Sequence, residues 1–226
     1  VITFAYLLKE QSTIEKIQDY YIIGSILASS GQFDEAIEYY TKAMNLNEGI
    51  GDAIMKTKIL MSMGSVYTKQ GRNKLAIKCY NEAYEFYKEQ KHSPLLTSCL
   101  LAIAKNYYEL GEYNEAFNYY NNVLNMIRQM KSGQEVEAFV DEMEEANILS
   151  SIAKTLVGLG RFEEAVKYQR ESLTIIKLMN DLIGESNSLV RLGEILMAVN
   201  RIGEAMSCFE QAMRIRKQIG EKYDPF

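Results

Sequence analysis

A six-residue stretch that recurs five times along the chain constrains its fold more than any other feature. In the third copy it reads Gly-Glu-Tyr-Asn-Glu-Ala, from Gly111 to Ala116. The copies begin at Gly31, Gly71, Gly111, Gly160 and Asn200, so the intervals between them are 40, 40, 49 and 40 residues. A fixed period in this range is typical of stacked units, each too small to bury its own hydrophobic face. The sequence therefore predicts a solenoid.

The segments on either side of each copy have the pattern of amphipathic helices. Before the first copy, apolar residues such as Ile14, Ile17 and Tyr21 recur at helical steps in a helix expected to run to about Ser30. After it, a second helix is expected over residues 34–49. Only two prolines occur in 226 residues, which suits helices because proline removes a backbone hydrogen bond. We therefore predict an all-α fold in which each unit is an antiparallel pair of helices.

The first residue of each copy is expected to end a helix. Glycine adopts the left-handed backbone conformation that stops a helix at almost no cost. Asparagine is the next most tolerant residue there, so Asn200 can replace glycine in the fifth copy.

The period divides residues 1–226, taken as one solenoid, into repeats. Five repeats are predicted, at residues 12–51, 52–91, 92–131, 141–180 and 181–220. Residues 1–11 are expected to end an incomplete repeat and residues 221–226 to begin another, so we expect further repeats or partners that cover both ends. Ser12 is expected to cap the first helix of the first repeat. The nine extra residues form an acidic insertion, 132–140, that either extends the next helix into solvent or docks a basic partner.

Small residues and aromatic rings keep the same register. Seven residues before each copy stand Gly24, Gly64, Ala104, Ala153 and Gly193, and nine residues after its start stand Tyr40, Tyr80, Tyr120, Gln169 and Phe209. The small residues let two helices approach, and the ring is expected to fill the space between one unit and the next. Gln169 and Ser172 break the pattern, so the fourth repeat is expected to pack most weakly on the fifth.

This order of small residue, turn glycine, alanine and aromatic ring resembles the tetratricopeptide repeat, over essentially the whole chain. The 40-residue unit is similar to the long-unit branch of that family, which includes Leu-Gly-Asn-type G-protein regulators, kinesin light chains and Rap-type peptide sensors. The segment from Asp181 to Gly193 is especially similar to the first of these. The resemblance implies a right-handed superhelix, in which the first helices of the pairs line a concave groove that binds a peptide or helix of a partner.

The resemblance also places groove positions on this sequence. The candidates are Lys58, Ser62, Lys105, Tyr108, Asn147, Lys154, Asn187 and Arg191. Four of them are cations, and Lys105 and Lys154 share one register, so these two are expected to stack in neighbouring units. We hypothesise that the cations pair with carboxylates of an acidic or C-terminal peptide, while the asparagines bond its backbone. The alternative is that the cations are solvated or pair with Glu109 and Glu194.

No pattern in the sequence points to catalysis, a metal or a cofactor. It contains no phosphate-binding glycine loop, nucleophile elbow or paired-histidine zinc motif. The single histidine, His92, stands at a repeat boundary and is expected in a loop. Cys79, Cys99 and Cys208 lack metal-ligand spacing and are expected to be reduced core residues.

Charge and hydropathy limit the class of partner. A net charge of -5 argues against a general binder of nucleic-acid backbones. No apolar run reaches the roughly 18 residues of a membrane span, and no leader is visible. We expect a cytoplasmic, noncatalytic protein–protein interaction scaffold that is part of a larger chain or complex. The alternatives are a peptide-sensing regulatory domain and a structural subunit of a cytoskeletal or ciliary assembly.

Overall fold

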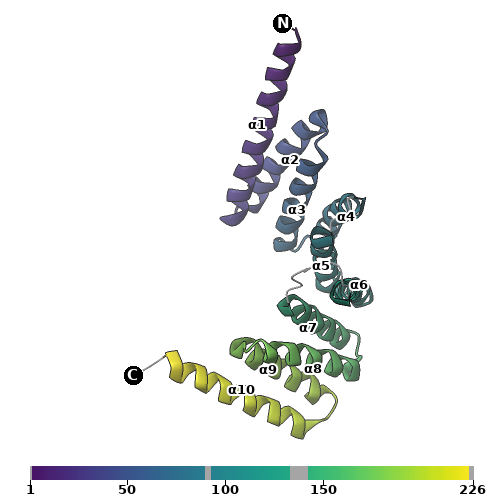
Figure 1. The fold of residues 1–226 in the computed structure, drawn as a ribbon, viewed down its shortest axis with the longest axis vertical. Coiled ribbons are helices and arrows are strands. Elements are labelled where there is room, and N and C mark those ends of the chain that lie inside the picture. The colour runs from purple at the N-terminus through teal and green to yellow at the C-terminus, as the bar shows by residue number, and fades with distance from the viewer. Residues whose placement is uncertain (1, 90–92, 133–141, 224–226) are drawn as a thin grey trace. The chain divides into compact units, whose positions relative to one another are not determined.

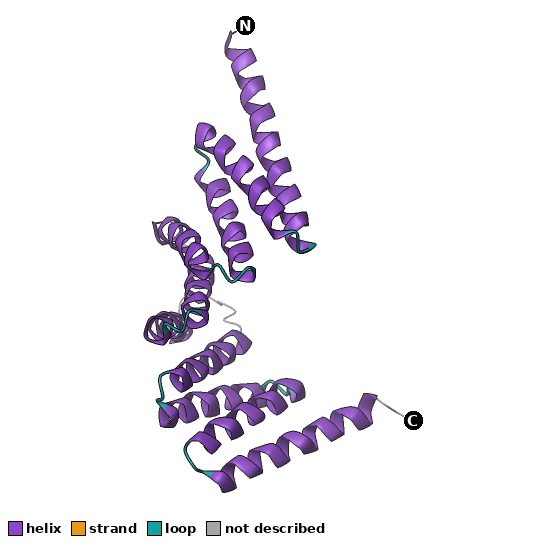
Figure 2. Cartoon of the chain, turned by 180° about the vertical axis from the view of Figure 1, so that it is seen from behind, coloured by secondary structure: helices purple, strands orange, loops and turns teal. Residues whose placement is uncertain are grey.

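A computed structural model describes residues 2–89, 93–132 and 142–223 (Figure 1). In these ranges the chain forms ten α-helices, and short loops join successive helices wherever the connection is described (Figure 2). The helices are α1 (Ile2–Ser29), α2 (Phe33–Ile50), α3 (Ala53–Lys69), α4 (Asn73–Glu89), α5 (Ser93–Glu109), α6 (Tyr113–Ser132), α7 (Glu142–Gly158), α8 (Phe162–Leu178), α9 (Leu182–Ala198) and α10 (Ile202–Tyr223). The all-α prediction is confirmed. His92 and residues 133–140 of the predicted insertion lie outside the described residues.

By its internal contacts the chain divides into two compact units, residues 1–110 and 111–226. The first unit contains α1 to α5 and the second contains α6 to α10. Each unit is described by itself below.

The turns inside the helix pairs have the conformation that the sequence predicts. Gly31, Gly71, Gly111 and Gly160 have φ between 71° and 83°, and Asn200 has φ of 60°. At four turns the next residue donates its backbone N–H to the carbonyl five positions back: Gln32 to Leu27, Arg72 to Tyr67, Arg161 to Leu156 and Arg201 to Leu196. This is the hydrogen bond by which a left-handed residue closes a helix. Asparagine therefore fills the glycine role at position 200, as expected.

At the join between the first two predicted repeats, one helix ends and the next begins. Gly51 has φ of 76° and ends α2. The carboxylate of Asp52 accepts hydrogen bonds from the backbone N–H groups of Ile54 and Met55, at 2.9 and 3.0 Å. These bonds satisfy two of the amides that a helix start leaves unpaired.

The helix start predicted at Ser12 is wrong. Helix α1 runs from Ile2 to Ser29 without interruption, so Ser12 lies inside it and cannot cap its start. None of the residues just before Ser12 is a glycine or proline, and Tyr6, Leu7, Leu8 and Lys9 are compatible with a continuous helix.

Glycine and aromatic side chains bring the helices of one pair together. A Cβ atom added to Gly24 would lie 2.8 Å from the ring of Tyr40, and one added to Gly64 would lie 2.8 Å from the ring of Tyr80. Each ring thus packs on the small residue of its own helix pair. The sequence predicts the ring only between one unit and the next. In the first unit the core continues to the next pair, because Tyr40 shares a buried cluster with Ile59 of α3.

The second unit has a core of the same kind. Leu149, Ile152 and Leu156 of α7 and Leu189 and Leu196 of α9 are buried. Gln169 and Ser172 of α8, where the pattern breaks, are buried as well, at 1% and 0% exposure. The hydroxyl of Ser172 donates to the backbone carbonyl of Ala146 at 2.7 Å. Polar contacts therefore replace the ring and the alanine of the pattern at these two positions. That the fourth repeat packs most weakly on the fifth stays a prediction.

Candidate functional site

The eight predicted groove residues lie on the first helices of the pairs. Helix α3 carries Lys58 and Ser62, α5 carries Lys105 and Tyr108, α7 carries Asn147 and Lys154, and α9 carries Asn187 and Arg191. The division of the chain places the first four in one unit and the last four in the other. The stacking of Lys105 beside Lys154 stays a prediction.

In the first unit the candidates are accessible but form no enclosed site. Lys58 and Lys105 are exposed, and neither forms an ion pair with the residues that the structure describes. The pairing of Lys105 with Glu109 that served as the alternative is therefore absent from this part of the chain. Ser62 lies with its hydroxyl 3.3 Å from that of Tyr21 in α1, and Tyr108 is half-buried.

In the second unit two of the candidates line a hollow of about 230 Å³. Helix α7 contributes Ser150, Lys154 and Val157, α8 contributes Gln169, and α9 contributes Arg191, Glu194, Ile195 and Ala198. We call it the Gln169 hollow. Lys154, Arg191 and Glu194 are exposed, whereas Gln169, Ser150 and Ile195 are buried. The charged groups therefore form its rim and the buried residues its base.

A chain of hydrogen bonds crosses the base of the Gln169 hollow. Arg191 Nη1 donates to Ser150 Oγ at 2.8 Å, and Ser150 Oγ donates to Gln169 Oε1 at 3.2 Å. Gln169 Nε2 in turn donates to Ser188 Oγ at 2.8 Å. A buried amide without partners would cost about 1–3 kcal/mol, but both ends of this one are satisfied. These hydrogen bonds therefore join α7, α8 and α9 and orient the guanidinium of Arg191.

The two asparagine candidates differ in how available they are. Asn147 is exposed on α7. Asn187 is exposed too, but Arg216 of α10 donates to its Oδ1 at 3.4 Å and to Ser186 Oγ at 2.9 Å. Asn187 is thus partly occupied by its own unit, whereas the amide of Asn147 faces solvent.

The sequence reading missed Gln169 as part of the site. It treated position 169 only as a defect in the aromatic column, although a polar residue at a packing position is itself a signal of a polar contact or a space. Ser188, Ile195 and Ala198 carried no signal of their own, because they come together with Gln169 only through the packing of α8 on α9.

The described residues show neither a metal-ligand cluster nor a membrane-spanning helix. They contain no group of three or more His, Cys, Asp or Glu side chains that could hold a metal ion, and no helix among them is long and apolar enough to cross a membrane. The three cysteines are buried. Burial raises the pKa of Cys99 to about 12 and that of Cys79 to about 11, so neither is an activated thiolate.

Solved structures share the fold of this chain at low identity. One is BtubC (BKLC) from P. vanneervenii, with 18% identity, a TM-score of 0.73, and coverage of 97% of this chain and 85% of that one. Another is a putative kinesin light chain from Podosopora anserina with nearly identical TPR-like repeats, with 15% identity, a TM-score of 0.73, and coverage of 92% and 97%.

A Rap protein solved in complex with competence and sporulation factor is also similar, with 18% identity and a TM-score of 0.64. That alignment covers 88% of this chain and 54% of the Rap protein. The predicted likeness to kinesin light chains and Rap-type proteins is thus confirmed at the level of fold. The likeness to Leu-Gly-Asn-type regulators stays a prediction.

The search of curated proteins gave no match. The sequence profile of the tetratricopeptide repeat, however, matches residues 19–89, 55–129 and 144–218. These ranges cover most of the chain and include both units. The chain belongs to the tetratricopeptide repeat family.

Proposed function

We propose that this protein is a noncatalytic protein-interaction module, and that the first helices of its second unit bind a partner peptide through carboxylates. The observation that carries the proposal is the position of Lys154 and Arg191 on two successive first helices, at the rim of one hollow. The arginine offers a planar fork of donors that suits a carboxylate, and the lysine offers a compact positive charge.

The charges around the hollow favour an anionic partner in a chain whose overall charge is -5. Arg191 donates to Ser150 through Nη1 and forms no ion pair with the residues that the structure describes. Its remaining donors are available to a ligand. Glu194 is the one acidic residue of the hollow and opposes a carboxylate, so its removal should strengthen binding.

Other candidates extend the proposed site. Asn147, exposed on α7, is proposed to bond the backbone of the peptide. Lys58 and Lys105, which lie in the first unit, are proposed to contact carboxylates of an acidic partner as well. The similar Rap protein, solved with competence and sporulation factor bound, supports a binding role for this fold.

Titration of acidic peptides against charge-reversal variants tests the proposal. A synthetic peptide of glutamates around one phenylalanine is the probe, and isothermal titration calorimetry measures its affinity. Lys154→Glu and Arg191→Glu should each weaken binding at least tenfold, because each replaces an attraction by a repulsion. Added salt should weaken binding to the unaltered protein.

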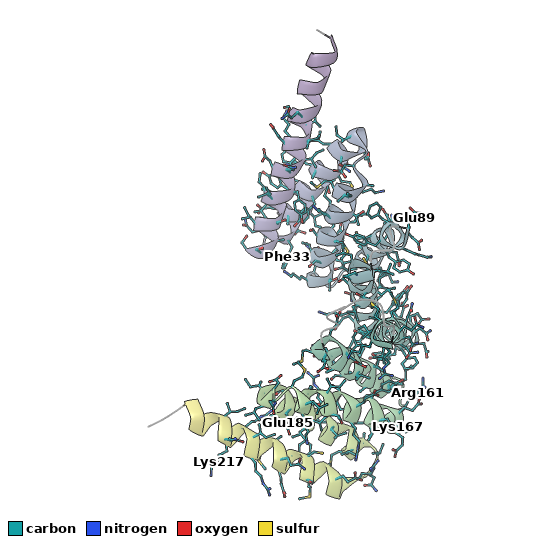
Figure 3. The ribbon with its side chains drawn as sticks, in the orientation of Figure 1. Phe33, Glu89, Arg161, Lys167, Glu185 and Lys217 are labelled. Atoms are coloured by element: carbon teal, nitrogen blue, oxygen red, sulfur yellow. The ribbon has the colours of Figure 1, made fainter. Side chains whose placement is uncertain are left out.

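The matched control is Lys167→Glu, which makes the same change on the exposed face of α8, a second helix of a pair (Figure 3). It should leave the affinity unchanged. Glu194→Gln should raise the affinity a few-fold. Equal affinity for the unaltered protein, Lys154→Glu and Arg191→Glu would contradict the proposal.

A further inference from the structure

The Gln169 hollow lies where the repeat pattern calls for an aromatic ring. In the first pair, the ring of Tyr40 lies on Gly24 and its hydroxyl donates to Ser25 Oγ at 3.1 Å. In the last pair, a Cβ atom added to Gly193 would lie 2.7 Å from the ring of Phe209. In each of these pairs the second helix supplies a ring that covers the first helix.

The fourth predicted repeat has the same register but no ring. Gln169 stands in the aromatic position, Ala153 in the small-residue position, and Lys154 in the position of Ser25. The amide of Gln169 is shorter than a tyrosine ring and is held at the base by Ser150 and Ser188. A tyrosine at position 169 would reach toward position 154, as Tyr40 reaches Ser25. With glutamine there, that space remains as the hollow, and Lys154 lies on its rim.

We propose that a partner supplies the missing ring: an aromatic side chain of a bound peptide inserts into the Gln169 hollow. This inference rests on the proposed function, since the ring belongs to the peptide whose carboxylates meet Lys154 and Arg191. It adds the class of residue that the site selects.

The size of the hollow suits one side chain. At about 230 Å³ it lies below the roughly 300–1,000 Å³ of pockets that enclose small molecules. The hollow is also several times larger than the roughly 30 Å³ that one water molecule occupies in the liquid. A single aromatic side chain fits a space of this volume.

The lining of the hollow suits an aromatic ring better than an aliphatic chain. Val157, Ile195 and Ala198 supply apolar contact surface, and Arg191 supplies a cation. A guanidinium is attracted to the face of an aromatic ring, and this attraction is absent for a chain of the same size without π electrons. The hydrogen bond from Arg191 to Ser150 holds that cation beside the space.

Peptides that differ only in their central residue test the inference. The probes are glutamate pentapeptides with phenylalanine, cyclohexylalanine, leucine or alanine in the centre, titrated by calorimetry. Burial of the ring predicts that phenylalanine binds about ten- to a hundredfold more tightly than alanine. The cation predicts that phenylalanine binds about two- to fivefold more tightly than cyclohexylalanine.

Two variants close the hollow from inside the protein. Gln169→Tyr restores the ring of the repeat, and Ala198→Leu adds bulk at an exposed position of α9 without touching the hydrogen-bonded chain. In both, the ratio of phenylalanine to alanine affinity should fall to about one. Ala53→Leu, the same substitution at an exposed position of α3, is the control and should leave the ratio as it is. Circular dichroism checks that each variant folds. If Gln169→Tyr does not fold, the affinity ratio of Ala198→Leu alone tests the inference.

The outcomes separate the two proposals. Equal affinity for the phenylalanine, leucine and alanine peptides, with a loss of binding in Lys154→Glu and Arg191→Glu, would overturn the aromatic inference and leave the carboxylate proposal standing. A preference for leucine equal to that for phenylalanine would also overturn it. Binding that ignores both charge reversals, or no binding of any probe, would overturn both proposals.

Discussion

At the level of single residues, the backbone conformation of the turns decides what each position accepts. Gly160 has φ of 71° and open space where a Cβ atom would be, so its requirement is conformational rather than steric. Gly203, inside α10, has open space too but lacks the positive φ. Glycine thus has opposite effects on stability at these two positions.

We expect Gly160→Ala to destabilise the protein by about 1–2 kcal/mol, since an L side chain is strained in the left-handed region. Gly203→Ala is the matched control and should stabilise it by about 0.5 kcal/mol, because alanine favours the helix and restricts the unfolded chain. Urea unfolding followed by circular dichroism measures both changes. A shift of the same sign for both variants would refute this account of the turn.

At the level of helices, a group of ion pairs around a carboxylate at the start of α7 links three of them. Glu145 is buried, at 6% exposure, and accepts from Lys131 at 2.5 Å and from Arg128 at 3.3 Å, both on α6. Arg128 also pairs with Glu171 of α8. Burial by itself raises the pKa of Glu145, but the hydrogen bonds from Lys131 and Arg128 outweigh it and lower the pKa below its ordinary value of 4.5.

Glu145→Gln should therefore destabilise the protein at pH 7 by about 1–2 kcal/mol. Charged hydrogen bonds contribute about 1.5–3 kcal/mol, and the partial exposure of Arg128 and Lys131 reduces this. Because the folded-state pKa is lowered, the stabilisation is complete above pH 4.5 and is lost as the pH falls through the lowered value. The difference between variant and unaltered protein should shrink accordingly in urea unfolding at successive pH values.

Glu144→Gln, in the same first turn of α7, is the control and should have a smaller effect with little change over that pH range. An equal loss in both variants would show that the helix dipole, rather than the ion pairs, is responsible.

The helices also show where sequence patterns mislead. Ser12 and Glu15 have the spacing of a capping box, yet α1 passes through them. The boundary at Gly51 and Asp52 is real because a residue that can leave the helix precedes the capping side chain. A capping pattern without such a residue does not end a helix.

At the level of the whole molecule, buried thiols report on the stability of each unit. Cys79 and Cys99 lie in the first unit and Cys208 in the second. Burial raises the pKa of all three, most for Cys99, which reaches about 12. Thiolate, the form that reacts, is therefore scarce in the folded protein.

We expect Cys99 to react with a disulfide reagent at pH 8 at least a hundredfold more slowly in the native protein than in denaturant. Variants that keep one cysteine each, labelled and followed by mass spectrometry, would give the opening of each unit separately. Labelling of native Cys99 at the denatured rate would contradict its burial.

The sequence by itself determined the repeat, the helix pairs and the turns, since these depend on local conformation and on a period visible in one dimension. It placed Lys154 and Arg191 among the binding candidates through the same register. Only the tertiary structure decided that Gln169 leaves a hollow beside them. That amide makes its hydrogen bonds with Ser150 and Ser188, each 19 residues away in the chain. The hollow is lined by α7, α8 and α9 together, and no local pattern records how these three helices meet.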